Sequence, residues 1–448
     1  MADVEIVSQD QSGEPGSPTL IDGHVCFFLP LQYISGESTN EINISPELND
    51  EEGADTQDQD SEETADTNAE GGDISEEDKS EIAVANMKVF ETLEFLKGLK
   101  TEKVAAKPPT AQFPKEPRVI AKQRLIRDLQ FCSVNSLEDP ESNPEWSEGG
   151  DISGPGTEDV KACYDNIGIF LDFMAEVFNR DSIDNRGCKV TASVNYEFNY
   201  PNAFYSSALG QVIFGTGFPM KGWMENDIVP VDDFIGITGN FVTGIDIVAH
   251  ELMHAITQCT VAEGNGLEYI GESGALAESI ADVFGIMTQQ WHSFKTDPSW
   301  TLKDSDWIVG KTAILPGYPN MGLRSLKDPG RAFRVATKTK ILNDLQIQDY
   351  LEIGEDVEVH IASGVPNKAF YEAVKEIGGL PWEKAGQVWY RALTSPSLKS
   401  NSSLSYFANI TFKEAVKLGK EIGDLDLGKK VQRAWRKVNV RYDTWDDE

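Results

Sequence analysis

The chain has 448 residues, and 40% of them are hydrophobic, so it can bury a substantial core in two or three domains. Its formal net charge of −35 at pH 7 argues against nucleic acid as a partner, because phosphates carry charge of the same sign.

Targeting and redox signals are weak. Five cysteines are scattered singly without a CxxC pair, and this odd count does not indicate a disulfide scaffold. No apolar run approaches membrane-spanning length, and the N-terminus lacks the basic region and apolar core of a signal peptide. We therefore expect no membrane partner and a cytoplasmic location by default, although non-classical secretion would leave the same pattern.

The first part of the chain divides into three segments. Residues 1–48 form a short N-terminus, and residues 49–81 mix many acidic residues with small polar ones, which predicts a disordered linker. That linker is either a solvating spacer, which we favour, or an interaction tail. In residues 82–116, apolar residues recur at helical spacing from 82 to 99 and predict an amphipathic helix that could dock on the rest of the protein.

The remaining chain is β-rich first and helical later. Val190–Tyr196 and residues 211–214 alternate or group apolar residues between Gly-rich turns, which predicts strands. After Gly244 the spacing of apolar residues is helical, and it stays so for most of the chain.

The first of these helices carries His250, Glu251 and His254 in the sequence HELMH. Histidines four residues apart lie on one helical face, so both imidazoles can reach one metal ion. Glu251 points off that face and can contact a water on the metal instead. Apolar residues surround this helix, which indicates burial, and buried histidines and carboxylates need partners. A metal would supply them, whereas a salt-bridged helix is the plain alternative.

A second apolar helix supplies the remaining parts of such a site. Catalytic zinc takes three protein ligands and keeps one position open, and Glu278 is the natural third ligand. Asp282 lies one turn further on the same face. From there it could accept the free ring N–H of a ligating histidine and fix its orientation.

These two helices resemble the thermolysin family of zinc metallopeptidases. Further blocks follow in the family's order and extend the resemblance over roughly residues 117 to 442, namely 200–205, 323–326, 359–371 and 382–386. Residues 306–310 and a faint proline-aromatic motif at 25–33 are similar to the protealysin-like branch. The resemblance implies an α+β fold: a β-rich lobe at 117–260, a helical lobe at 261–448, and the zinc site in the cleft between them.

The resemblance also implies roles in peptide-bond hydrolysis. Glu251 would take a proton from the attacking water and pass it to the leaving amine. Tyr269 and His360 would donate hydrogen bonds to the negatively charged carbonyl oxygen, the oxyanion, that forms during the reaction. Each could instead be an ordinary core residue. A carboxylate should orient His360. The family's usual run before this histidine is altered here, so we predict Asp356 and keep Glu355 as the alternative.

Substrate contacts follow from the same resemblance. Arg324 would grip a substrate carbonyl through two N–H groups, with a plain ion pair as its alternative role. Leu323 and Ile247 would flank a pocket for a bulky hydrophobic residue after the scissile bond. Asn202 and the backbone of Ala203 would bind the substrate as an added strand.

Calcium is possible in this family beside the active site, but its ligands are only partly kept. Asp246 and Asp306 remain, whereas Gln289, Ile308 and Lys311 stand at the other positions. Isoleucine and lysine cannot serve a cation that requires oxygen ligands. We therefore expect the paired calcium site to be lost and Zn²⁺ to be the cofactor.

Together these features predict a zinc-dependent neutral endopeptidase that acts on peptide or protein substrates. It would be made as a self-processing zymogen, with its own pro-segment or a protein inhibitor as a further partner. The alternative is a catalytically inactive zinc-binding interaction protein of the same fold. Because Glu251, Tyr269, Arg324 and His360 are not needed merely to hold zinc, we favour the enzyme.

Overall fold

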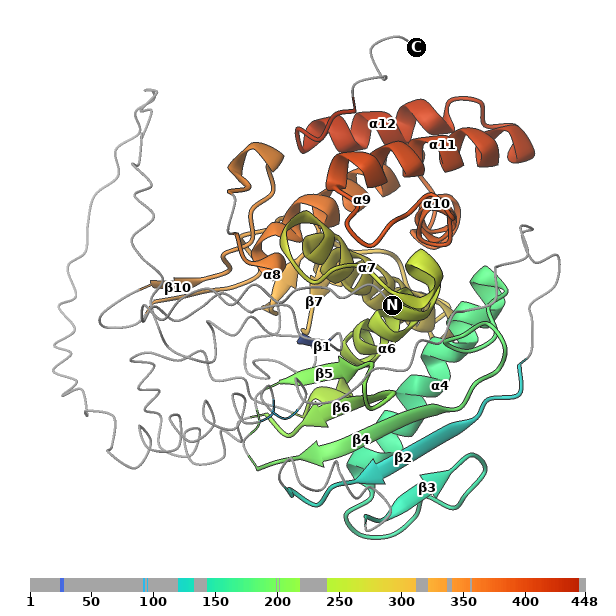
Figure 1. Cartoon of the computed structure of the whole chain (residues 1–448), viewed down its shortest axis with the longest axis vertical. Helices are drawn as coiled ribbons and strands as arrows, with labels where there is room; N and C mark the ends of the chain where they lie inside the picture. The colour runs from blue at the N-terminus through green and yellow to red at the C-terminus, as the bar shows by residue number, and fades with distance from the viewer. Residues whose placement is uncertain are drawn as a thin grey trace, which may run out of the picture.

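The computed structural model describes residues 25–27, 92, 95, 120–132, 143–198, 200, 202–217, 240–311, 321–336, 341–354 and 357–442. They form a lobe built on a mixed β-sheet and a lobe built of helices, seen below and above in Figure 1. The predicted two-lobed α+β fold is confirmed.

The described part of the first lobe contains a six-stranded sheet in the order β1-β5-β6-β4-β2-β3. Its strands are β1 (Val25–Phe27), β2 (Arg124–Asp128), β3 (Glu145–Ser147), β4 (Val190–Tyr196), β5 (Ala203–Ser206) and β6 (Gln211–Gly215). β4 is parallel to both β2 and β6, and the other pairings are antiparallel. The strands predicted from the sequence at 190–196 and 211–214 are confirmed as β4 and β6.

Helix α4 (Glu158–Phe178) packs against this sheet and against α6 (Ile245–Thr260). Its buried face includes Ile167, Phe170 and Met174, all fully removed from solvent. Each such side chain stabilises the fold by about 1.5–3 kcal/mol through burial. The sheet is therefore held against the helices that carry the histidines.

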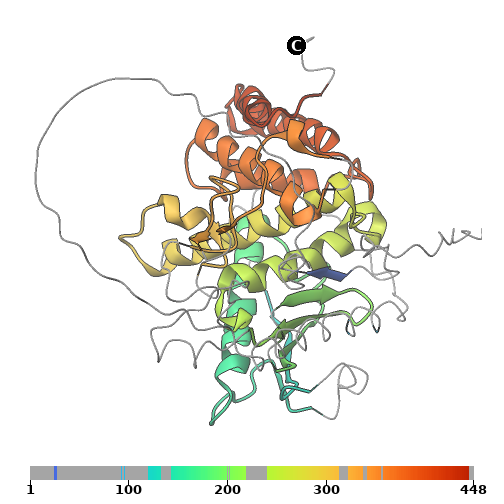
Figure 2. The same cartoon turned by 90° about the vertical axis from the view of Figure 1, so that its left-hand side faces the viewer.

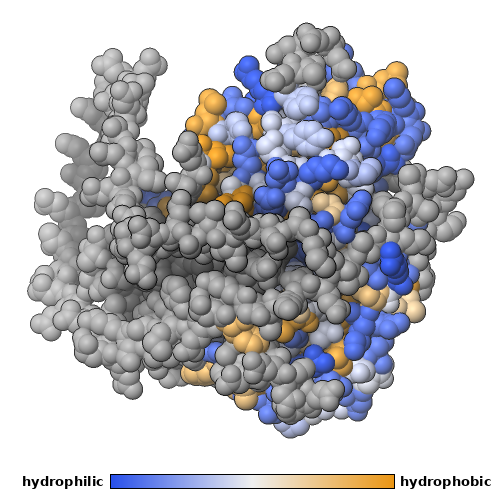
Figure 3. Space-filling view, in the orientation of Figure 1, coloured by the Kyte–Doolittle hydropathy of each residue, from blue (hydrophilic) through white to orange (hydrophobic). Residues whose placement is uncertain are grey.

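Helix α6 lies between the sheet and the helical lobe, which consists of α7 (Gly271–Thr296), α8 (Val359–Ala362), α9 (Gly364–Ile377), α10 (Lys384–Leu393), α11 (Leu404–Ile422) and α12 (Leu427–Lys437). Its core includes the parallel rings of Trp389 and Trp435, whose centroids are 5.9 Å apart. The Trp435 indole N–H donates to Thr411 Oγ1 at 2.9 Å, so its buried polar atom is paired. Hydrophilic side chains predominate on the face of this lobe shown in Figure 3.

Short elements connect these helices. They are the strands β7 (Ile308–Val309), β8 (Arg324–Ser325), β9 (Arg334–Ala336) and β10 (Ile341–Asn343), and the 3-10 turns η2 (Phe241–Thr243), η3 (Val261–Gly264), η4 (Asp304–Trp307) and η5 (Tyr350–Glu352). Among the described helices, none combines the length and apolar character that crossing a membrane requires.

Helices α6 and α7 pack closely because a glycine lies between them. A Cβ atom at Gly285 of α7 would come within 2.6 Å of the backbone oxygen of Asp246 in α6. No side chain fits in that space. The close crossing brings the histidines of α6 within reach of the carboxylates of α7.

Two short pieces of the N-terminal region lie on the β-sheet lobe. β1 pairs with β5 and extends the sheet at that edge, as Figure 2 shows, with Val25 opposite Ser206 and Phe27 opposite Phe204. Thr92 is helical and buried, and its Oγ1 lies 2.7 Å from the Tyr196 hydroxyl. Phe95 is also helical and packs, partly buried, against the core. The other residues of the helix expected over 82–99, and the acidic stretch 49–81, lie outside the described residues.

Candidate active site

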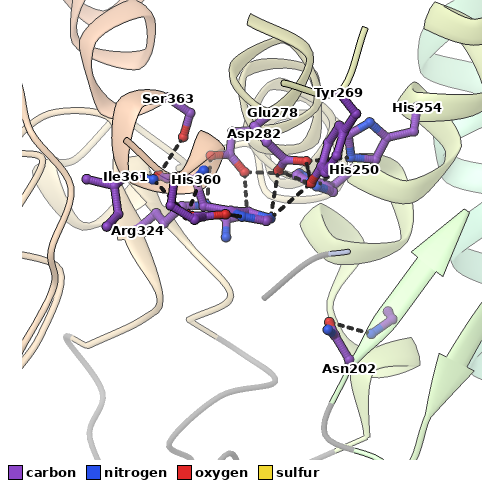
Figure 4. Close-up of polar contacts among 12 residues, drawn as sticks. Asn202, His250, His254, Tyr269, Glu278, Asp282, Arg324, His360, Ile361 and Ser363 are labelled. Atoms are coloured by element: carbon purple, nitrogen blue, oxygen red, sulfur yellow. Dashed lines mark hydrogen bonds and ion pairs between the residues drawn. The ribbon is translucent and has the colours of Figure 1, made fainter. Parts of the chain in front are cut away.

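Side chains from α6 and α7 meet at one point in the interior. The Nε2 atoms of His250 and His254 are 3.0 Å apart, because residues four apart share a helical face. Oε2 of Glu278 lies 3.4 Å from His250 Nε2, and Oε1 lies 3.4 Å from His254 Nε2. Figure 4 shows these three side chains turned toward one another.

This cluster fits a zinc site. Its ligand atoms all lie within 4.8 Å of one another, and all three residues are buried. Oε2 of Glu278 has no hydrogen-bond partner among the described residues, although it is buried. Two imidazoles and one carboxylate are a typical ligand set for catalytic zinc, which keeps its fourth position open. Only this cluster, of the described residues, has the geometry of a metal site.

Glu251 lies beside the cluster without belonging to it. The residue is fully buried, and neither carboxylate oxygen has a hydrogen-bond partner in the described part of the chain. Burial raises the pKa of Glu251 to about 8. A buried carboxylate without a partner is costly, so the place of Glu251 beside the cluster leaves its oxygens available to a ligand bound there.

Asp282 connects the cluster to residues behind it. Its Oδ1 lies 3.0 Å from His250 Nδ1, in the place predicted for the carboxylate that orients a histidine. Arg324 donates to both oxygens of Asp282, at 2.7 and 2.8 Å, and Asn367 Nδ2 donates at 2.9 Å. Burial opposes the charge on Asp282, but Arg324 and His250 outweigh it and lower the pKa to about 2.

Arg324 therefore makes the buried ion pair that the sequence left open as its alternative role. The pair fixes one edge of the guanidinium and does not exclude a contact with substrate. Asn367 was not singled out as a site residue from the sequence. It lies within the histidine motif at 359–371, and only the fold shows that its amide reaches Asp282.

Tyr269 and His360 also approach the cluster. The Tyr269 hydroxyl donates to Glu278 Oε1 at 2.6 Å and lies 3.3 Å from His360 Nε2. His360 Nε2 is 3.4 Å from Glu278 Oε2. Both side chains thus point polar atoms toward Glu278 of the cluster (Figure 4).

The carboxylate that contacts His360 differs from the one expected. Nδ1 of His360 pairs with Oε1 of Glu358, two residues earlier in the chain. Asp356 and Glu355, predicted for this place, lie outside the described residues. The prediction is corrected to Glu358, because the N-terminus of α8 begins at Val359 and holds the preceding side chain against the imidazole.

The expected substrate-binding residues lie on several elements. Asn202 is buried, and its Oδ1 accepts from the backbone N–H of Ala203 at 2.9 Å. Figure 4 places Asn202 across from the cluster. Ile247 lies in the first turn of α6, and Leu323 directly precedes Arg324; both are buried. The edge of β5 is not open, because β1 pairs with it.

Comparisons with known proteins agree with this geometry. Residues 121–232 match the family model described as thermolysin metallopeptidase, catalytic domain, and residues 265–440 match the model for its alpha-helical domain. The chain is 33% identical to Protease PrtS of Photorhabdus sp. (strain Az29) over 65% of this chain and 71% of that protein. It is 34% identical to an extracellular metalloprotease of Pectobacterium carotovorum subsp. carotovorum over 63% and 72%, respectively.

A solved structure of a metalloproteinase precursor is also similar to this chain. The precursor of protealysin, a metalloproteinase from Serratia proteamaculans, matches with a TM-score of 0.58 and 29% identity, covering 79% of this chain and 93% of that one. Fold, site and relatives together define a metalloendopeptidase. The chain belongs to the thermolysin family of metallopeptidases and is protealysin-like within it, as its motifs predicted.

Proposed function

We propose that this metallopeptidase uses zinc held by His250, His254 and Glu278 to cleave peptide bonds within proteins. The observation that carries the proposal is Glu251, a buried carboxylate without a hydrogen-bond partner among the described residues, beside a cluster that fits the metal. When bound, zinc would supply a Lewis acid that polarises the scissile carbonyl and activates a water.

The side chains around the cluster divide the remaining chemistry. Glu251 takes a proton from the attacking water and passes it to the leaving amine. Tyr269 and His360 donate to the negative charge that develops on the carbonyl oxygen. Their polar atoms lie 3.3 Å apart, which supports a shared target. Asp282 orients His250 through its Nδ1.

Substrate recognition combines a strand contact with a pocket. Asn202 and the main chain of Ala203 bind an extended substrate as an added strand, which tolerates many sequences. Arg324, anchored by Asp282, approaches a substrate carbonyl. Leu323 and Ile247 give the pocket apolar walls, so we propose a preference for bulky hydrophobic residues after the scissile bond.

Hydrogen bonds from the backbone take the place of calcium at the acidic residues that remain of the expected calcium site. Oδ2 of Asp246 accepts from the backbone N–H of Gly310 at 2.7 Å, and Oδ2 of Asp306 accepts from the backbone N–H of Lys303 at 2.8 Å. One carboxylate oxygen of each acidic residue that remains at the expected calcium positions is thus engaged within the protein, whereas Asp246 Oδ1 is buried without a hydrogen-bond partner among the described residues. Ile308 and Lys311 offer no oxygen ligand from their side chains.

Removal of metals and selective reloading test both metal proposals. Removing zinc with 1,10-phenanthroline should abolish hydrolysis of a furylacryloyl-type peptide, and added Zn²⁺ should restore it. Protein stripped of all metals and reloaded with Zn²⁺ alone should regain the full rate and melting temperature, and further addition of Ca²⁺ should change neither. Activity that survives removal of zinc would contradict the zinc proposal, and a melting temperature that recovers only when Ca²⁺ is added with Zn²⁺ would contradict the loss of calcium.

The N-terminal region supports a zymogen. β1 pairs along the edge of β5, the strand that begins at Ala203. Because the substrate is expected to add as a strand at this same edge, residues 25–27 would compete with substrate. Thr92 contacts Tyr196 in the same lobe. We infer that the first hundred or so residues inhibit the enzyme until self-cleavage releases a core beginning near Pro117.

Breaking the β1 pairing should activate the intact chain. Proline removes a backbone donor and does not fit a regular ladder. Cys26→Pro should therefore raise the initial rate of peptide hydrolysis by about tenfold, the effect of about 1.4 kcal/mol of lost pairing. Cys26→Ser keeps the backbone pairing and is the matched control. Equal rates for both intact variants, with integrity checked on a gel, would refute inhibition by β1.

A further inference from the structure

The imidazole of His360 is held by a residue of its own short helix. Oε1 of Glu358 contacts the ring at Nδ1, while Oε2 accepts from the backbone N–H of His360 at 2.9 Å and of Ile361 at 3.2 Å. One carboxylate therefore caps α8 and binds the ring at the same time. Because α8 has only four residues, its own hydrogen bonds give it little rigidity.

The main chain of His360 is held separately by Gln346. The Gln346 amide is buried, and its Nε2 donates to the carbonyl oxygen of His360 and to Ser363 Oγ, both at 3.0 Å. Ser363 Oγ in turn donates to the same carbonyl at 2.9 Å. A further backbone bond joins Ile347 N–H to the carbonyl of Ile361 at 3.2 Å.

The segment that carries Gln346 is itself fixed. Asp344 is almost fully buried, and its Oδ1 accepts from the backbone N–H of Gln346 at 2.9 Å. Its Oδ2 accepts from the N–H groups of Gly330 and Ala332 at 3.0 and 3.1 Å. Residues 344–347 therefore form a rigid support between the 330–332 loop and α8.

We propose that Glu358 and Gln346 are positioning residues for His360, one acting on the imidazole and the other on the main chain, so that Nε2 stays directed at the zinc cluster. This inference rests on the proposed role of His360 as a donor to the oxyanion. Donors of that kind must be held in place before the reaction to be effective. Within the described part of the chain, the hydrogen bonds of Glu358 and Gln346 go to α8 and its support and not to His250, His254 or Glu278.

Glu358→Gln leaves one acceptor oxygen where the carboxylate has two. The amide oxygen can cap α8 or accept from the imidazole but cannot do both, and the amide carries no charge to pair with the ring. We expect kcat of the full-length chain to fall by about tenfold or more, with KM, bound zinc and melting temperature nearly unchanged. Gln346→Leu, which removes the Nε2 donor to the His360 carbonyl and leaves the Ser363 donor, should lower kcat in the same way.

Ser403→Ala is the matched capping control. Ser403 Oγ caps α11 by accepting from Tyr406 N–H at 3.2 Å, away from the zinc cluster. This variant should lower the melting temperature and leave kcat unchanged.

A double-mutant cycle decides whether the effect passes through His360. In a His360→Ala background, Glu358→Gln and Gln346→Leu should cause no further loss of kcat. A further tenfold loss there, or an unchanged kcat for Glu358→Gln alone, would overturn the inference while leaving the peptidase intact. If the unmutated chain hydrolyses no peptide, the proposed function is wrong and the inference is wrong with it. If His360→Ala keeps full kcat, the proposed role of His360 is wrong, and the inference that rests on it is also wrong.

Discussion

Glu251→Gln is expected to lower kcat for peptide hydrolysis by about 100- to 10,000-fold, the usual contribution of a positioned general acid–base group. The substitution preserves size and shape but removes the group that accepts a proton. Because Glu251 is not among the three residues of the cluster, bound zinc should be retained. Steady-state kinetics together with metal analysis of the purified protein measure both quantities.

The matched control for this change lies on the surface. Glu352→Gln makes the same chemical change on an exposed residue of η5 and should leave kcat and zinc unchanged. A Glu251→Gln protein that keeps a tenth or more of the original kcat would show that another group carries the proton. Loss of zinc in that variant would instead mean that Glu251 supports the metal.

Asp282→Asn should weaken both zinc binding and the fold. The carboxylate holds His250 at 3.0 Å and Arg324 through two bonds, and all three side chains are buried. Removing one member of a buried ion pair leaves the other charge uncompensated and costs about 3–5 kcal/mol. Loss of the contact to a ligating histidine typically lowers metal affinity by about 10- to 100-fold.

Two measurements separate these effects. Denaturant unfolding of the zinc-free protein gives the loss of stability, and competition with a chelator of known affinity gives the loss of zinc binding. Glu376→Gln is the control, because its partners Arg433 and Lys437 have half-exposed side chains, and such pairs contribute about 0–1 kcal/mol. If Asp282→Asn is no more destabilising than Glu376→Gln, the Asp282–Arg324 pair does not stabilise the buried site.

The parts of the site that lie on regular helices could be predicted from the sequence. Spacing of four residues placed His250 and His254 on one face of α6, and Glu278 with Asp282 on one face of α7. The structure brings these four side chains together because Gly285 lets the two helices cross closely. The strands at 190–196 and 211–214 could also be predicted, because the local periodicity of apolar residues indicates which face of an element is buried.

Contacts between segments distant in the sequence could not be predicted in this way. The residue that orients His360 depends on where α8 begins, and a shift of two residues changes the answer from Asp356 to Glu358. Gln346 carries no motif, and its role depends on a loop that Asp344 fixes from a third segment. The pairing of β1 with β5 joins residues far apart in the chain, and no local pattern specifies it.

The first measurement should follow the unmutated full-length chain and Glu251→Gln during incubation, recording bound zinc, peptide hydrolysis and N-terminal trimming on a gel. We predict zinc in both proteins, with hydrolysis and trimming only in the unmutated chain. Zinc in both and hydrolysis in neither, even after the N-terminal segment has been removed by another protease, would contradict the peptidase and favour an inactive zinc-binding interaction protein.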